Sequence, residues 1–226
     1  MSDAVDYKAL ASLRWFGYGQ WSAPFWFIGM EPGGNDDDAN YDAWYQLGGG
    51  ELIDCRQHHL NSGCKKWHCG DRPPTQSTWR RLIQVFLAFE DKPTELDAVS
   101  RFQRDSFGAI DGNIALIELS ALHARSLQEK VNRKAHLPER LSLIEKRLSQ
   151  HPPKFALFYG RDYREHYERI EGVRFGSDGM CWRDDTLCVL APGPTARYPT
   201  ACSKPKYWIE LGTTMRKRIE HRMIKG

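Results

Sequence analysis

Short apolar runs alternate with longer amphipathic stretches along the chain. Four runs are almost continuously apolar and rich in aromatic or β-branched residues, which favours strands buried on both faces of a parallel sheet. Each of them ends in a glycine, proline or serine turn. The four predicted strands are 25–28, 113–119, 155–159 and 186–190.

The stretches between these runs carry apolar residues at helical spacing. In 78–90, for example, Trp79, Ile83 and Phe86 fall on one face, and Ser77 precedes them as a candidate N-cap. The main predicted helices are 5–16, 40–47, 78–90, 94–107, 137–150 and one after residue 203. Strands separated by helices indicate a parallel sheet covered on both faces. We therefore predict one domain over 1–226, a three-layer α/β/α sandwich with a central four-stranded parallel sheet.

Composition and charge narrow the class of protein. The chain has 226 residues, of which 41% are hydrophobic, and this suits one compact domain with a sizeable core. No apolar run approaches the ~20 residues of a membrane span, so we expect a cytoplasmic protein without membrane contact. The formal charge is only +3, but the stretch 197–225 is strongly basic. Such a stretch is compatible with a phosphate backbone, or is simply solvated.

The stretch 25–34 runs from the first predicted strand directly into a Gly/Pro turn that carries one carboxylate, Glu31. In parallel sheets, ligands bind just beyond the carboxyl ends of the strands. Gly29, Gly33 and Gly34 would let the backbone turn sharply there and let a ligand come close. The alternative is an ordinary strand-to-loop turn with a solvated Glu31.

A similar turn follows the last predicted strand. The first turn reads Gly29-Met30-Glu31-Pro32-Gly33 and the last reads Ala191-Pro192-Gly193-Pro194. Together, and in this order, they resemble the turns of the uracil-DNA glycosylase superfamily. Its members carry a Gly-x-(Asp/Asn)-Pro or Gly-Glu-x-Pro-Gly turn after the first strand and a His-Pro-Ser-Pro-like loop after the last. The resemblance extends over about 25–215 in the order of elements.

The resemblance implies a role for Glu31 and a base pocket around it. Glu31 would orient the attacking water, and its charge would stabilise the positive charge that develops on the sugar. Gly33 stands where classical uracil enzymes have a tyrosine, so the pocket should be open toward the 5-position of a pyrimidine. Tyr41 and Trp44 could stack on a flipped base, although packing is the alternative for both. The implied pocket residues are Gly29, Met30, Pro32, Gly33, Gly34, Tyr41, Trp44, Glu118, Ser120 and His123.

Two departures from the family pattern bear on the substrate. Ala191 stands where the last motif usually has histidine, and His123 or Arg125 are the candidate substitutes. The position that reads uracil through an asparagine falls near Glu118 or Ser120 instead. A glutamate accepts from an exocyclic amine, as on cytosine, better than it pairs with uracil. An ion pair beside the sheet is the alternative for Glu118.

The loop after the last strand is the expected DNA contact. In relatives this loop pushes a wedge into the duplex while neighbouring residues hold the phosphates, which supports base flipping. An exposed basic loop without this role is the alternative. The predicted DNA-binding residues are Arg125, Pro192, Gly193, Pro194, Thr195, Arg197, Tyr198, Lys204 and Lys206.

The segment 55–70 concentrates cysteine, histidine and lysine without a helical or strand period. Zinc takes four Cys or His ligands in a tetrahedral structural site, and the segment lacks apolar anchors that would fold it otherwise. The candidate ligands are Cys55, His59, Cys64 and Cys69, although their spacing matches no standard zinc finger. Free thiols are the alternative in an intracellular protein.

These features predict a monomeric DNA glycosylase whose chemistry needs no cofactor. Its substrate would be a modified pyrimidine, such as the glucosylated hydroxymethylcytosine of phage DNA that bacterial antiviral members of the superfamily remove. Plain uracil excision and a non-catalytic DNA-binding module on the same scaffold are the alternatives. The chain lacks the Walker loop, the Gly-x-Ser-x-Gly elbow and the Gly-x-Gly-x-x-Gly fingerprint of other α/β enzymes.

Overall fold

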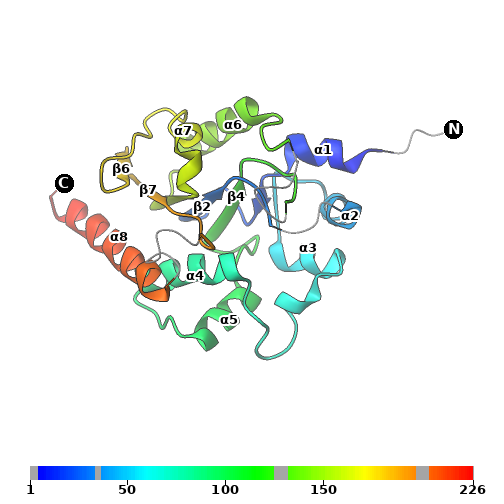
Figure 1. The fold of residues 1–226 in the computed structure, drawn as a ribbon, viewed down its shortest axis with the longest axis horizontal. Helices are drawn as coiled ribbons and strands as arrows, with labels where there is room; N and C mark the ends of the chain where they lie inside the picture. The colour runs from blue at the N-terminus through cyan, green and yellow to red at the C-terminus, as the bar shows by residue number, and fades with distance from the viewer. Residues whose placement is uncertain (1–4, 34–36, 125–131, 197–203, 226) are drawn as a thin grey trace.

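The computed structural model describes residues 5–33, 37–124, 132–196 and 204–225 (Figure 1). Its described part contains a seven-stranded sheet with the order β3-β1-β4-β2-β5-β7-β6. The four central strands, β4, β2, β5 and β7, are mutually parallel, whereas β1 is antiparallel to β4 and β6 is antiparallel to β7. The strands are β1 Gly17–Tyr18, β2 Phe25–Gly29, β3 Leu52–Ile53, β4 Ile114–Glu118, β5 Phe155–Tyr159, β6 Met180–Arg183 and β7 Thr186–Ala191.

The predicted strands are the parallel centre of this sheet, but the prediction of a four-stranded sheet is wrong. The three additional strands lie outside the parallel centre. Strands β1 and β3 have two residues each, which is too short to show any periodicity in sequence. Strand β6 is an edge strand that is only partly buried, so it lacks the apolar signal of the central strands.

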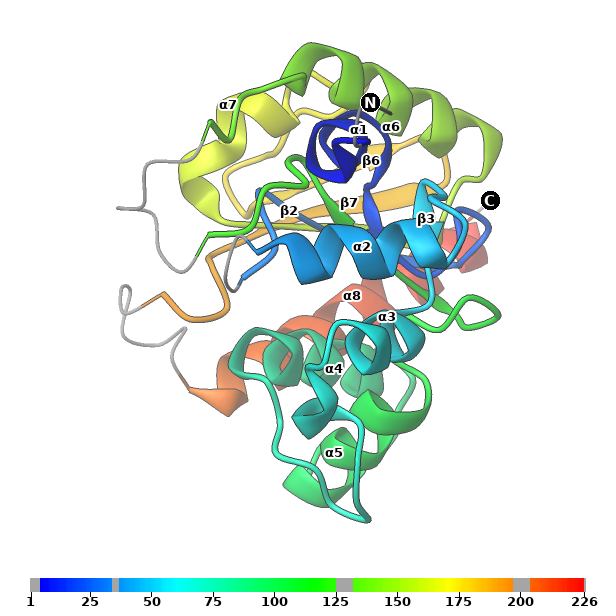
Figure 2. The ribbon, with the colours of Figure 1, turned by 90° about the vertical axis from the view of Figure 1, so that its right-hand side faces the viewer.

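Helices cover both faces of the sheet (Figure 2). Helices α4, α5 and α8 pack against one core, to which β2 contributes Phe25 and Phe27. Helix α6 packs against the other core, to which β2 contributes Trp26 and Ile28. This alternation buries every residue of β2 and agrees with the layered arrangement expected from the sequence. The helices are α1 Tyr7–Arg14, α2 Asp38–Gln46, α3 Cys55–Asn61, α4 Ser77–Phe89, α5 Leu96–Asp105, α6 Leu137–Gln150, α7 Arg164–Tyr167 and α8 Pro205–Lys225, with the 3-10 turns η1 Lys65–Trp67 and η2 Arg161–Tyr163.

The segment 55–70 is more regular than its sequence suggests, because it contains α3 and η1. Asp54 caps α3 by accepting a hydrogen bond from the Gln57 backbone. The buried side chain of Gln103, on α5, then donates to the carbonyls of Trp67 and Pro74. The Gln103 anchor of this segment is polar and comes from a distant helix, so no local apolar pattern revealed it.

No helix in the described ranges combines the length and apolar character that crossing a bilayer requires.

The order of the parallel strands indicates where a ligand would bind. Among these strands, the chain passes from β2 to its neighbour β4, and then crosses back over β2 to β5. The strand order therefore reverses between β2 and β5, which is where parallel sheets bind ligands, beyond the carboxyl ends of the strands. The register aligns four strand ends in one row there: Glu118, Gly29, Tyr159 and Ala191.

Candidate active site at the carboxyl edge of the sheet

The last residue of β2, Gly29, leaves space for a side chain from the neighbouring strand. The Tyr159 ring, at the end of β5, lies so close that a Cβ atom on Gly29 would be 2.3 Å from its Cζ atom. The Tyr159 hydroxyl thereby reaches Glu118, at the end of β4, and donates a hydrogen bond of 2.8 Å to its Oε1 atom. Gly29 is needed for this close approach, and not for the sharp turn that the sequence suggested, because it ends a regular strand.

The loops after β2 and β4 run side by side beyond the sheet. The Ser120 amide donates to the Met30 carbonyl at 2.7 Å, and the Ala124 amide donates to the Pro32 carbonyl at 3.1 Å. A parallel bridge then joins Gly33 to Ala124. Among the described residues, a Cβ atom on Gly33 would meet no atom within 4 Å, so this position has space for a side chain. Gly34 lies outside the described residues.

Glu31 is enclosed in this loop and paired with a cation. Its side chain is 10% exposed, and its Oε1 atom lies 3.0 Å from Nε of Arg133, in the segment that precedes α6. Burial raises the pKa of Glu31, and the Arg133 guanidinium opposes that rise. Among the described residues, its Oε2 atom is buried and has no hydrogen-bond partner. The alternative of a solvated turn carboxylate therefore does not describe Glu31.

Glu118 has a different electrostatic environment. Burial of its carboxyl group raises the pKa to about 8, and the charge of Glu31 adds to this effect, while the hydrogen bond from Tyr159 opposes it. At neutral pH the carboxyl group of Glu118 therefore keeps its proton. Its Oε2 atom is buried without a hydrogen-bond partner in the described part of the chain. Its direct side-chain partner is a tyrosine hydroxyl and not the cation of an ion pair.

We call these residues the edge site: Glu31, Glu118, Arg133, Tyr159 and Tyr163. Tyr163 lies in η2, after β5, and burial together with the charge of Glu31 raises its pKa to about 12. Burial raises the pKa of both carboxyl groups, and the rise is opposed by the Arg133 guanidinium at Glu31 and chiefly by the Tyr159 hydroxyl at Glu118. Two carboxyl groups in such different environments can act as general acid and general base.

The raised pKa of Glu118 predicts how stability depends on pH. Between the ordinary glutamate value of about 4.3 and about 8, the folded chain keeps a proton that the unfolded chain has lost. The free energy of unfolding should therefore fall as the pH rises through this window. Replacing Glu118 by glutamine should remove this contribution, because the amide stays neutral and still accepts from Tyr159. Urea unfolding of both proteins at several pH values measures the difference, and a stability gap that stays constant with pH would contradict the assignment.

Several predicted pocket residues have structural roles instead. Tyr41 and Trp44, on α2, are buried in the core at 1% and 0% exposure, so the packing alternative describes both. Met30 is buried in the opposite core. The Ser120 hydroxyl accepts from the Leu122 amide at 3.1 Å, which stabilises the local turn after β4.

His123, one proposed substitute for the missing motif histidine, is not in the edge site. It is buried, with its ring 5.7 Å from Trp15 and 6.0 Å from Tyr41 between centroids. Arg125, the other candidate, lies outside the described residues. Instead, β5 places Tyr159 between Gly29 and Ala191 in the row of strand ends.

The sequence reasoning missed Tyr159, Tyr163 and Arg133. Tyr159 is the polar final residue of an apolar run, which is the same signal that singled out Glu118. Arg133 carries no such signal, because it precedes α6 and reaches Glu31 only in the folded chain.

A basic cavity of about 200 Å³ separates the start of α4 from the loop after β7. Burial lowers the pKa of Arg81, and the like charge of neighbouring Arg80 lowers it further. Two guanidinium groups beside a helix N-terminus form a favourable environment for an anion. The lining residues are Ser77, Arg80, Arg81, Pro194, Thr195 and Ala196.

The other described residues that were predicted to bind DNA are not among those that line this cavity. Pro192 and Gly193 lead into it, and the Ala196 amide donates to the Gly193 carbonyl to form a turn. Lys204 and Lys206 are exposed at the start of α8, where Lys206 lies 3.7 Å from Glu210. The predicted residues Arg197 and Tyr198 lie outside the described ranges.

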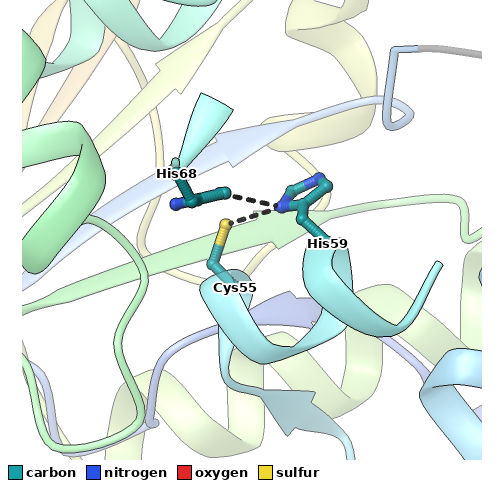
Figure 3. Close-up of side chains that lie close together, drawn as sticks. All are labelled: Cys55, His59 and His68. Carbon is teal, nitrogen blue, oxygen red and sulfur yellow. Dashed lines mark hydrogen bonds between the residues drawn. The ribbon is translucent and has the colours of Figure 1, made fainter. Parts of the chain in front are cut away.

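The segment 55–70 brings together a group that could hold a metal ion: Cys55, His59 and His68 (Figure 3). Two of the four predicted ligands belong to this group. His68 takes a place that the sequence had given to cysteine, whereas Cys69 is exposed. The predicted ligand set is therefore corrected at Cys69, because the structure brings His68, and not Cys69, to Cys55 and His59.

No family model matches the chain, and no curated protein gives a significant match to it.

Proposed function

We propose that this protein is a DNA glycosylase that hydrolyses the N-glycosidic bond of a flipped, modified pyrimidine and leaves an abasic site. Glucosylated hydroxymethylcytosine of phage DNA is the substrate that the motifs favour. The observation that carries the proposal is the pair of carboxyl groups that follow or end adjacent strands: Glu31, paired with Arg133, and Glu118, which accepts a hydrogen bond from the Tyr159 hydroxyl. In this proposal the protein acts as a monomer in the cytoplasm and needs no cofactor for the chemistry.

Glu31 is the proposed general base. Breaking an N-glycosidic bond develops positive charge on the sugar, and a buried carboxylate stabilises this charge and orients a water for attack. Its partner Arg133 opposes the rise in pKa that burial causes and so favours the ionised form. Its unpartnered Oε2 atom is the acceptor that a water molecule would use.

Glu118 is the proposed general acid and base reader. A cytosine ring leaves poorly as an anion, so a proton donated to the ring lowers the barrier to its departure. The neutral carboxyl group can donate to an acceptor on the ring, and its other oxygen can accept from the exocyclic amine. This role compensates for Ala191, where the family pattern has histidine. The open position at Gly33 supports a base with a bulky 5-substituent.

The basic cavity supports binding of the DNA backbone. We expect the double substitution of Arg80 and Arg81 by alanine to weaken binding of DNA and to flatten its salt dependence by about one unit of slope per lost phosphate contact. Fluorescence anisotropy across a series of salt concentrations measures both effects. Replacing Lys146 and Lys154, two exposed lysines that do not line the cavity, by alanine removes the same charge and is the matched control, which should change the slope less. Equal effects of both changes would contradict a specific role for the cavity.

An assay for abasic sites on a panel of duplexes tests the proposed function. The panel contains unmodified DNA, uracil-containing DNA, and DNA with hydroxymethylated or glucosylated cytosine. The proposal expects abasic product from the modified cytosine duplexes. Product from uracil DNA alone would support the uracil alternative.

A non-catalytic DNA-binding module is the second candidate, and the ion pair between Glu31 and Arg133 favours it, because the pair already engages the carboxylate. Tight DNA binding without abasic product on any member of the panel would support this candidate.

A further inference from the structure

A second cluster of chemically active side chains lies in the segment 55–70, which contributes no residue to the edge site. Cys55 and His59 are four residues apart on α3, so their side chains lie on the same face of the helix. His68 directly follows η1 and is buried, with 1% exposure. The sulfur of Cys55, Nδ1 of His59 and Nε2 of His68 all lie within 4.8 Å of one another (Figure 3).

Two of the three separations among these atoms are close to those of tetrahedral coordination. The Cys55 sulfur lies 3.5 Å from Nδ1 of His59, and this nitrogen lies 3.1 Å from Nε2 of His68. Zinc bond lengths of about 2.05 Å to nitrogen and about 2.3 Å to sulfur give edges of ~3.6 Å for sulfur–nitrogen pairs and ~3.3 Å for nitrogen–nitrogen pairs in a tetrahedron. The two measured separations are therefore close to those that one ion would impose.

Hydrogen bonds among these three side chains cannot satisfy all three ligand atoms at once. Nδ1 of His59 faces both the Cys55 sulfur and Nε2 of His68. If it carries a proton, it can donate to His68, and the thiol then has no acceptor on this nitrogen. If it is unprotonated, the thiol and the His68 ring compete for one lone pair. A metal ion would use all three lone pairs at once.

We propose that Cys55, His59 and His68 bind a zinc ion in a structural site, with Cys64 as the fourth ligand. Cys64 stands just before η1 and is half-buried, but it is not in the group whose ligand atoms lie within 4.8 Å of one another, so its side chain must turn to reach the ion. Two cysteines and two histidines form a usual closed set for structural zinc. The ion would connect α3 to η1, which is otherwise anchored through Gln103. This site shares no residue with the edge site and does not depend on the proposed glycosylase activity.

Metal analysis of the untagged full-length protein tests the proposal. We expect about one zinc ion per chain, and a lower melting temperature after removal by a chelator, because ligand binding to the folded state stabilises it. Addition of cobalt to the stripped protein should produce the visible absorption of a tetrahedral ion with thiolate ligands. Substoichiometric zinc together with an octahedral cobalt spectrum would overturn the site.

Variants then identify the ligands. Substitution of His68 by alanine or of Cys64 by serine should lower the zinc content and change the cobalt spectrum. The matched control is Cys69→Ser, because Cys69 lies in the same segment but is exposed. Equal zinc loss in the control would overturn the ligand assignment, as would full zinc retention in the His68 variant. If a variant fails to fold, the zinc content and cobalt spectrum of the wild-type protein still decide whether the site exists.

Discussion

Replacement of Glu31 by glutamine should lower the rate of base excision by about 10²–10⁴-fold, the usual contribution of a general base. Glutamine keeps the size of the side chain but cannot accept a proton from water or carry the charge that stabilises the sugar cation. Single-turnover release of base from the modified duplex that the panel identifies is the measurement. Affinity for the same duplex should stay unchanged, because Glu31 lies in the edge site and not in the basic cavity.

The control for this substitution is Glu51→Gln. Glu51 also forms an ion pair with an arginine, Arg147, at 2.8 Å, but it lies in the loop before β3. The control should therefore change stability without slowing excision. A Glu31 variant as active as the wild-type protein would exclude this carboxylate as the base, whatever the role of Glu118.

Substitution of Gly29 by alanine should destabilise the protein by about 1–3 kcal/mol, the range for adding a methyl group to a packed site. The added Cβ atom would lie 2.3 Å from both Cζ and the hydroxyl oxygen of Tyr159, so the ring must move away from Glu118. We therefore expect a loss of excision activity as well. Urea unfolding measures the stability change, and the matched control is Gly33→Ala, whose new methyl group would meet no atom within 4 Å.

A double substitution tests whether the loss of stability in Gly29→Ala acts through the Tyr159 ring. In a protein that already carries Tyr159→Ala, the further change Gly29→Ala should cost much less stability, because the ring that it would strike is gone. An equal cost in both backgrounds would show that the effect of alanine at Gly29 does not act through Tyr159. Activity should stay low in the double variant, since the hydrogen bond to Glu118 is also lost.

The folded structure also changes the interpretation of individual motif residues. Tyr41 and Trp44 looked like stacking surfaces because aromatic residues near a ligand loop often serve that purpose. They are core residues because α2 packs against α1 and Trp15, which no local pattern indicates. Glu118 looked like a reader of the base or half of an ion pair, and its partner is Tyr159. That partner ends a strand 41 positions further along the chain.

The sequence by itself determined the central parallel strands, the helices between them and the Gly/Pro turns at their ends. These features depend on local periodicity and on backbone preferences, which each segment carries on its own. Only the tertiary structure decided which side chains meet at the carboxyl edge. The register places Glu118, Gly29 and Tyr159 in one row, and Arg133 reaches Glu31 from the segment before α6. Contacts of this kind depend on strand order and on burial, which also raises the pKa of both carboxyl groups.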